Sequence, residues 1–264
     1  MIRHSLALRL ELDATRSLRV LLRQAAQAGA RGLVLDAGGD LAPDRLSESG
    51  RREMRHLLRT AEQNLVALCL PTRRAFDTLD QLDDRLARAD RAFALAFELG
   101  APLALIRAGV VPPESEPDRR EIFTNSLREL ARRAEHRGVV LAIETGNEPA
   151  ANLRAFLDAL KVETLAASLD PASFLRIGID PVVAARELGP WVAHAYLADS
   201  AGTTRTARVV HPGGRGFSPG VLDWEEYLGA LEEIQYRGVL TVWPDPTEDP
   251  SARFREVVKL LARF

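Results

Sequence analysis

The chain alternates along its whole length between short aliphatic runs and longer segments whose apolar residues recur at helical spacing. Such alternation is typical of βα units, in which a buried parallel strand is followed by a helix that packs on the sheet. The short runs are Ser5–Leu10, Gly32–Leu35, Leu65–Cys69, Leu103–Ile106, Val139–Ile143, Leu165–Leu169, Val192–Leu197 and Val239–Val242. The helical segments lie at roughly 17–28, 48–63, 79–99, 118–137, 152–160, 180–188, 223–235 and 251–264. Eight such units without a linker predict an α/β fold, one closed (β/α)8 TIM barrel over residues 1–264.

Glycines at the ends of the predicted helices support this division of the chain. A glycine follows five of the helical segments and precedes the next aliphatic run by a few residues, at Gly29, Gly100, Gly138, Gly189 and Gly238. No aliphatic run is followed by the G-x-G-x-x-G turn of a dinucleotide-binding half, so two Rossmann-like domains and a nucleotide cofactor are not expected.

The segment 79–99 has the clearest helical pattern, because Leu79, Leu82, Leu86, Phe93 and Phe97 fit one helix stripe. Two long connections are expected, at 109–117 after the fourth run and at 199–222 after the seventh. Long ordered loops in compact domains are more often functional than decorative.

Composition excludes several classes of protein. Apolar residues make up 46% of the chain and charged residues 27%, which describes a globular chain with a sizeable core. Asp and Glu together number 37 against 35 Lys and Arg, so the chain lacks the basic excess with which nucleic-acid-binding proteins displace counterions. No run of ~18 apolar residues is present, so neither a membrane span nor export is indicated.

Two scarce residue types narrow the chemistry. Lys161 and Lys259 are the only lysines and neither follows a predicted strand, which disfavours Schiff-base and P-loop mechanisms. Cys69 is the single cysteine and lies in an apolar run, so no disulfide framework or cysteine-rich metal site can form within one chain. A reducing cytoplasm fits this composition.

In a barrel of this kind the active site gathers where the strands end, so the polar residues at those points are the candidates. They are Asp36, Arg73, Arg74, Arg107, Glu144, Asp170, His194, Tyr196, Asp199, Trp243 and Asp245. Glu144 and Asp170 follow adjacent predicted strands directly, and two converging carboxylates suit either a divalent ion or acid/base catalysis.

Each candidate also has a structural interpretation. Asp170 precedes Pro171, and an acidic residue there is a common helix cap. His194 and Tyr196 share one strand face, so they either reach the mouth or pack in the barrel lumen. Arg215 lies in a glycine-rich loop that either folds over a ligand or is solvated.

Short motifs recur in order along nearly the whole chain. They are Ala28–Asp36, Ala96–Ala101, Arg107–Gly109, Leu141–Glu144, Leu169–Pro171, His194–Asp199, Leu222–Trp224 and Tyr236–Val242. With these motifs the sequence resembles the sugar phosphate isomerase/epimerase family, whose fold is the xylose isomerase-like TIM barrel. That resemblance implies a divalent ion held by a Glu after strand 5, an Asp after strand 6, a His in strand 7 and a Glu after strand 8, with the two glutamates as the acid/base pair.

The chain departs from that pattern at two of the four positions. Glu144 and Asp170 match, but Tyr196 stands in place of the histidine and Trp243 in place of the last glutamate. Neutral tyrosine is a poor ligand for Mg or Mn, and an indole N–H only donates. A site for Mn, Mg, Zn or Co is therefore either absent or rebuilt from Glu144 and Asp170 with His194 or Asp245.

Two functions remain open at this point. The first is an isomerase or epimerase that acts on a small sugar, polyol or sugar acid by abstracting a proton next to a carbonyl. Glu144 would then be the base and Asp170 a second acid or metal ligand. Substrate contacts would come from Arg73, Arg107, His194, Tyr196, Arg215 and Trp243, the last by stacking on a sugar ring. The second is a non-catalytic barrel that binds a sugar-like ligand. Barrels of this kind often pair, so a homodimer is an expectation in either case, with no nucleic-acid or membrane partner.

Overall fold

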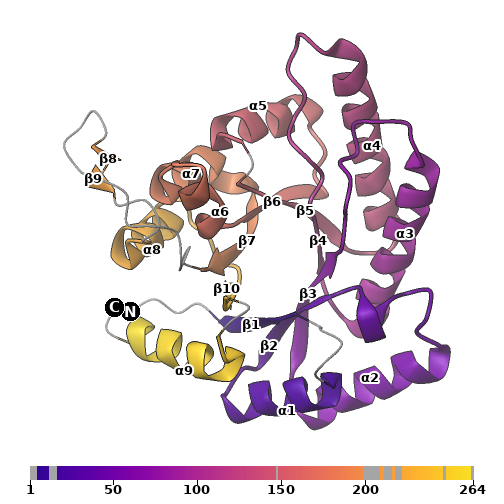
Figure 1. The fold of residues 1–264 in the computed structure, drawn as a ribbon, viewed down its shortest axis with the longest axis vertical. Coiled ribbons are helices and arrows are strands. Elements are labelled where there is room, and N and C mark those ends of the chain that lie inside the picture. The colour runs from indigo at the N-terminus through magenta and orange to yellow at the C-terminus, as the bar shows by residue number, and fades with distance from the viewer. Residues whose placement is uncertain are drawn as a thin grey trace.

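The strands close into a ring of eight parallel neighbours (Figure 1). The computed structural model describes residues 5–11, 17–146, 148–198, 209–210, 216–217, 222–245 and 248–262. The ring consists of β1 (Leu6–Leu10), β2 (Gly32–Asp36), β3 (Asn64–Leu70), β4 (Leu103–Ile106), β5 (Val140–Glu144), β6 (Leu165–Leu169), β7 (Val192–Leu197) and β10 (Leu240–Val242). It closes because β1 pairs with both β2 and β10. The predicted (β/α)8 barrel is confirmed, and each predicted run forms its strand.

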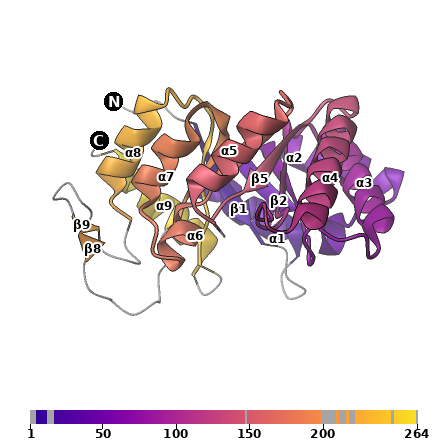
Figure 2. The ribbon, with the colours of Figure 1, turned by 90° about the horizontal axis from the view of Figure 1, so that it is seen from above.

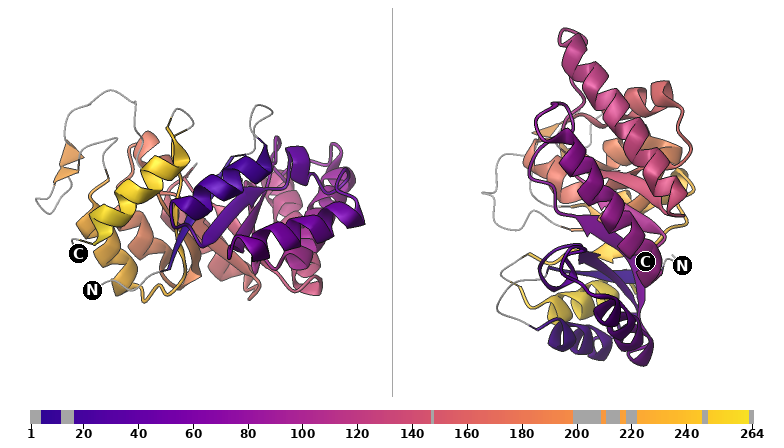
Figure 3. Two further views of the ribbon diagram at one scale, coloured as in Figure 1. Left: turned by 90° about the horizontal axis from the view of Figure 1, so that it is seen from below. Right: turned by 90° about the vertical axis from the view of Figure 1, so that its right-hand side faces the viewer.

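Helices surround this ring at the predicted places. They are α1 (Leu18–Gln27), α2 (Glu48–Thr60), α3 (Leu82–Leu99), α4 (Pro117–His136), α5 (Ala150–Leu160), α7 (Pro181–Leu188), α8 (Trp224–Glu233) and α9 (Pro250–Leu261). The last helix, α9, lies beside α1 and against β1, so the first and last βα units form the seam of the barrel (Figure 3). None of the helices in the described part of the chain is both long and apolar enough to cross a bilayer.

Five short elements of the described residues were not predicted from the sequence, because they carry too few residues to show a period. They are α6 (Pro171–Arg176), the 3-10 turns Gly39–Leu41 and Gly189–Trp191, and the antiparallel pair β8 (Val209–Val210) and β9 (Gly216–Phe217). The β8–β9 pair lies in the β7–α8 connection, outside the ring of helices (Figure 2). The α6 helix directly follows β6 and matters for the site below.

The buried stripe of α3 differs from the predicted one. Leu86 and Phe93 are buried as expected, but Phe97 is 63% exposed, and Leu79, which lies before the helix, is 71% exposed. The helix instead buries small side chains, Ala89, Ala92 and Ala96, between its larger apolar residues. The five-residue stripe was wrong at its ends, because a helix that packs on a barrel buries the positions that face the strands, whatever their size.

Strand alternation separates two buried layers. Outward side chains pack against the helices in the main core, whereas inward ones fill the lumen with mostly small residues around one large ring, Tyr196. The lumen cluster contains Val34, Ala67, Cys69, Leu105, Ala142, Ala166, Ala172, Tyr196 and Ala198. Polar residues replace apolar ones at the top of this inward layer, where the strands end.

Candidate functional site

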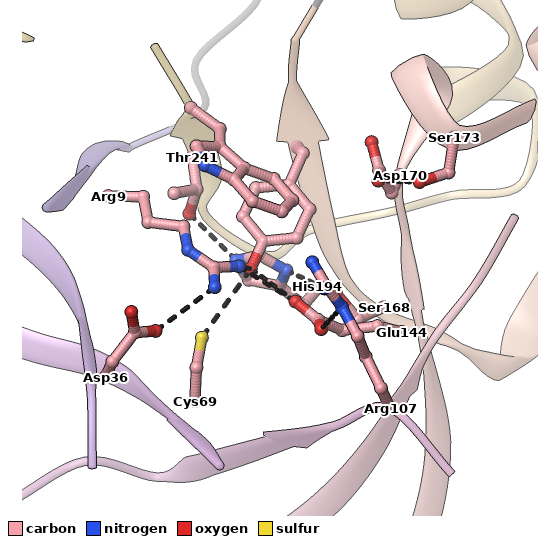
Figure 4. A network of polar contacts seen from close by, with 12 residues as sticks. Arg9, Asp36, Cys69, Arg107, Glu144, Ser168, Asp170, Ser173, His194 and Thr241 are labelled. Carbon is pink, nitrogen blue, oxygen red and sulfur yellow. Dashed lines mark hydrogen bonds and ion pairs between the residues drawn. The ribbon is translucent and has the colours of Figure 1, made fainter. Parts of the chain in front are cut away.

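Arg9 of β1 lies at the centre of the barrel mouth and reaches three other strands (Figure 4). Its Nη1 donates to Glu144 Oε1 at 2.8 Å and to the Tyr196 hydroxyl at 2.5 Å. Its Nη2 donates to Asp36 Oδ1 at 3.1 Å. The residue is only 6% exposed. One buried guanidinium therefore joins side chains from β2, β5 and β7.

Two aromatic rings flank this guanidinium. The Arg9 Cζ atom lies 3.9 Å from the centre of a Trp243 ring and 5.5 Å from that of Tyr196. The two rings contact each other with centroids 4.8 Å apart. Trp243 is held in turn by a hydrogen bond from its Nε1 to Glu11 Oε1, 3.0 Å away. Aromatic faces stabilise a cation, most of all where water is excluded.

Burial by itself lowers the pKa of Arg9, since it penalises the charged form. The surrounding Cys69, Tyr196, Glu144 and Asp36 groups outweigh burial, so the net pKa of Arg9 lies above its usual value. Arg9 is therefore a permanent positive charge at the mouth of the barrel.

Glu144 is held on both carboxylate oxygens. Oε1 accepts from Arg9 and, at 3.1 Å, from the Tyr196 hydroxyl, while Oε2 accepts from Arg107 Nε at 3.0 Å. Burial raises the pKa of this carboxyl, but the charges of Arg9 and Arg107 outweigh burial and leave its pKa below the usual value. Glu144 is thus ionised, buried and placed between two cations.

Arg107 is the outer of these two cations. Its side chain is 55% exposed, against 6% for Arg9, and its carbonyl accepts a hydrogen bond from the Thr72 hydroxyl at 2.8 Å. Arg73 is also exposed on the neighbouring β3–α3 connection, next to Arg74, which pairs with Asp80. An approaching ligand would meet Arg107 before it met Arg9. Arg215, the third predicted anchor, lies outside the described residues.

Asp170 makes the contacts of a helix cap. Its Oδ1 accepts from the Ala172 N–H at 3.1 Å at the start of α6, and its Oδ2 accepts from the Ser173 hydroxyl. Burial raises the pKa of Asp170, and the hydrogen bond from Ser173 opposes that rise. Figure 4 shows Asp170 and Ser173 apart from the Arg9 cluster. The capping interpretation thus describes its contacts, and its predicted catalytic role stays a prediction.

His194 lies deeper in the lumen than the mouth residues. Its ring is fully buried, with Nδ1 2.8 Å from the Ser168 hydroxyl and Nε2 2.8 Å from the Thr241 hydroxyl. It also makes an edge contact with Tyr196. Burial lowers its pKa to about 3, so the ring is neutral. Both ring nitrogens are already used, and substrate binding by His194 stays a prediction.

Glu148 is a second buried carboxyl that the sequence analysis did not single out. It is 8% exposed, its Oε1 accepts from the Val111 N–H at 3.0 Å, and its Oε2 has no partner among the described residues. Burial raises its pKa to about 7. Glu148 and Glu144 line one cavity of about 10 Å³, measured as the space open to the centre of a water molecule, which is room for about one water.

The residues at the mouth do not fit a divalent ion. Arg9 occupies the space between Glu144 and Asp36, Asp170 caps α6, and both nitrogens of His194 have partners. Asp245 follows β10, where its N–H donates to Glu248 at 2.9 Å. Within the part of the chain that the structure describes, no three His, Cys, Asp or Glu residues are placed to hold a metal ion.

Arg9 is the central residue that sequence reasoning missed. The signal was a charged residue inside the aliphatic run Ser5–Leu10. Arg9 stands between Leu8 and Leu10 on one strand, so its side chain points to the opposite face from those two buried leucines. A charged residue among the side chains of a barrel strand that point into the lumen would have indicated a functional residue.

Solved structures with similar folds come from several bacteria. A xylose isomerase domain protein from Planctomyces limnophilus superposes with a TM-score of 0.77 at 20% identity, covering 98% of this chain and 95% of that one. The 3-keto-D-glucoside 4-epimerase of E. coli gives 0.76 at 16% identity, covering 99% and 100%. A Mycobacterium smegmatis barrel in complex with magnesium gives 0.75 at 16%, covering 99% and 96%. At these identities the likeness concerns the fold.

Sequence comparison identifies the family. The uncharacterised protein YfiH of Bacillus subtilis is 30% identical over 111 residues, which is 36% of this chain and 36% of that protein. The match thus spans about a third of the length of this curated relative. A family model described as the xylose isomerase-like TIM barrel matches residues 22–264. The chain therefore belongs to the xylose isomerase-like TIM barrel family.

Proposed function

We propose that the protein is an isomerase or epimerase that binds a small sugar, polyol or sugar acid at the barrel mouth and abstracts a proton next to a carbonyl. The observation that carries this proposal is the position of Glu144, a buried carboxylate between two arginines where the strands end. A base next to fixed N–H donors suits this reaction, since the donors stabilise the negative charge that develops on oxygen. Solved structures of similar fold, a 3-keto-D-glucoside 4-epimerase and a D-psicose 3-epimerase among them, support the class of substrate.

The order of events follows from exposure. Arg107 is exposed and held to Glu144 by one contact, so a substrate carbonyl oxygen competes for its N–H groups. Once Arg107 turns to the substrate, Oε2 of Glu144 is free to accept a proton from the adjacent carbon. The C–H electron pair moves into the enediolate, whose oxygen Arg107 neutralises. Loss of the Arg107 contact also raises the pKa of Glu144, which makes it a stronger base at that moment.

The remaining predicted contacts have defined places in this proposal. Trp243 offers an aromatic face for a sugar ring, and Tyr196 holds Oε1 of Glu144. Arg73 is an exposed anchor for a hydroxyl or carboxylate group. Asp170 as second acid, His194 and Arg215 as substrate contacts, and a homodimer stay predictions.

One observation favours the second candidate function, a non-catalytic sugar-binding barrel. Both oxygens of Glu144 are ion-paired and its pKa is lowered, and a carboxylate in that state is a weak base. If Arg107 does not release Glu144, the site binds a ligand without proton transfer.

Deuterium exchange separates the two functions without knowledge of the product. The protein is incubated in D2O with a panel of ketoses, aldoses and sugar acids, and NMR follows exchange at the carbon next to the carbonyl. We expect exchange on at least one substrate and a loss of about 100-fold or more in Glu144→Gln. The exposed Glu225→Gln on α8 is the matched control and keeps the wild-type rate.

Two results would contradict the enzymatic proposal. Unchanged exchange in Glu144→Gln would remove that residue as the base. A panel member that raises the melting temperature through binding but never exchanges would identify the protein as a non-catalytic binder.

A further inference from the structure

The buried guanidinium of Arg9 lies among oxygens from three strands. Glu144 Oε1, Asp36 Oδ1 and the Tyr196 hydroxyl surround it at 2.8, 3.1 and 2.5 Å. We propose that Arg9 is the resident cation of the barrel mouth. Its guanidinium occupies the place between Glu144 and Asp36 that a divalent ion would need, and it thereby excludes such an ion. This inference concerns the charge of the site and holds whether or not the site turns over a substrate.

Two arginines and two carboxyl groups meet around this position. Arg9 contacts both carboxyl groups, Glu144 and Asp36, whereas Arg107 contacts Glu144. Without Arg9, two carboxylates on different strands would face one exposed arginine. Two carboxylates that converge on one point attract a divalent ion, which completes its shell with water. In this structure the Arg9 guanidinium lies between the two carboxyl groups, where such an ion would have to bind.

The packing around Arg9 keeps it in place. Trp243 and Tyr196 lie near the guanidinium, and the residue is only 6% exposed. If the guanidinium left this position, the buried Glu144 carboxylate would keep only the exposed Arg107 as a countercharge, and losing a buried ionic partner is costly. A divalent ion could not share the position, because it would lie against a fixed positive charge.

The guanidinium also keeps some donor capacity. Its Nε is buried and has no partner among the described residues, while Nη1 and Nη2 use three contacts. Arginine is not deprotonated in proteins, so the positive charge is present at every pH at which the barrel is folded. The mouth therefore offers an oxygen-rich ligand a permanent positive charge without a bound metal ion, and Arg107 is the exposed neighbour of Arg9.

The experiment measures metal binding, so it does not depend on turnover. Binding of Mn²⁺ is followed by electron paramagnetic resonance, and the melting temperature is recorded in EDTA and in Mg²⁺, Mn²⁺, Zn²⁺ or Co²⁺. The wild-type protein is expected to bind no stoichiometric Mn²⁺ and to show the same melting temperature in each solution. Arg9→Gln is expected to bind Mn²⁺ at least tenfold more tightly and to recover part of its lost melting temperature when Mn²⁺ is added.

Arg107→Gln is the matched control. This variant also removes one positive charge that contacts the Glu144 carboxylate, but it leaves Arg9 in place. No gain of Mn²⁺ binding is therefore expected. The double variant Arg9→Gln/Glu144→Gln is expected to lose the metal binding gained by Arg9→Gln.

The inference would be overturned by a wild-type protein that binds one Mn²⁺ per chain and loses it in Glu144→Gln. This measurement needs no Arg9 variant, so it decides the matter even if Arg9→Gln does not fold. A folded Arg9→Gln that binds Mn²⁺ no better than Arg107→Gln would also overturn it. Failure of the proposed reaction shows instead in the exchange experiment, which these outcomes do not affect.

Discussion

Glu148 is a buried carboxyl that forms no ion pair with any residue the structure describes. One oxygen accepts a backbone N–H, the other has no partner among the described residues, and the charge of Arg120 acts on it only as a smaller effect than burial. Glu144 lines the same cavity but is neutralised by its own arginines. Burial therefore disfavours the ionised form of Glu148, which raises the pKa of this carboxyl to about 7.

This raised pKa predicts a loss of stability at higher pH. The folded protein holds the Glu148 proton up to a pKa of about 7, whereas the unfolded chain releases it near 4.5, so the contribution of Glu148 to the free energy of unfolding falls as pH rises between these values. The full effect is on the order of 3 kcal/mol. Glu148→Gln is expected to remove this contribution and to be more stable than wild type at pH 8, as measured by urea unfolding.

The control for Glu148 is Glu225→Gln, an exposed glutamate on α8. Its stability should follow the wild-type curve at every pH. A Glu148→Gln variant that followed the wild-type curve as well would show that Glu148 is ionised in the folded protein.

At the scale of elements, the β5–α5 connection and the short helix α6 depend on each other. Gly146 has a φ of +108°, and a Cβ placed on it would meet the backbone of Ser173 at 3.0 Å and collide with the Ser173 side chain. Asp170 accepts hydrogen bonds from α6, and its own N–H donates to Thr145 at 3.0 Å. Gly146 lines the same cavity as Glu144 and Glu148, so the close approach of these two connections shapes that cavity.

Gly146→Ala is expected to be clearly destabilising, because it adds both backbone strain and a collision with α6. Gly178→Ala is the matched comparison, since Gly178 also has a positive φ, +75°, but nothing lies within 4 Å of an added Cβ. Gly178→Ala should cost about 1 kcal/mol from strain alone, and Gly146→Ala at least about 1 kcal/mol more. Thermal unfolding of both variants measures the difference, and equal costs would mean that α6 moves away freely.

At the scale of the whole molecule, two buried groups oppose each other in their effect on pH stability. His194 is neutral when folded, with a pKa of about 3, while the unfolded chain protonates it near 6.5. The stability that it contributes is therefore complete above about 6.5 and is lost as pH falls. Glu148 acts in the opposite direction over about 4.5 to 7. These two contributions should thus nearly cancel between pH 4.5 and 6.5.

His194→Gln tests this balance by urea unfolding from pH 4 to 8. With the histidine removed, the Glu148 contribution is no longer opposed by it, so this contribution should increase stability as pH falls from 7 to 4.5, by about 1.4 kcal/mol per pH unit at most. The overall stability of the variant will be lower, because Ser168 and Thr241 lose a buried partner. A slope equal to that of wild type would contradict the neutral state assigned to His194.

The sequence predicted the barrel because parallel strands are buried on both faces and therefore read as continuous aliphatic runs. It placed Glu144, Arg107, Tyr196 and Trp243 at the strand ends by the same logic, and the structure brings these four together. The sequence left the role of Asp170 open, because an aspartate that precedes a proline at the end of a strand can be either a helix cap or a site residue. It missed Glu148 because nothing in the sequence marks a loop glutamate as buried.

By itself the sequence determined the order of strands and helices and which residues stand at the ends of the strands, because those properties follow from the local periodicity of the chain. Only the tertiary structure decided what occupies the centre of the mouth. Arg9 comes from the first strand and Glu144 from the fifth, and they meet because the barrel closes and directs both side chains into one lumen. Their contact depends on strand tilt and register over 135 positions of sequence, which no local pattern records.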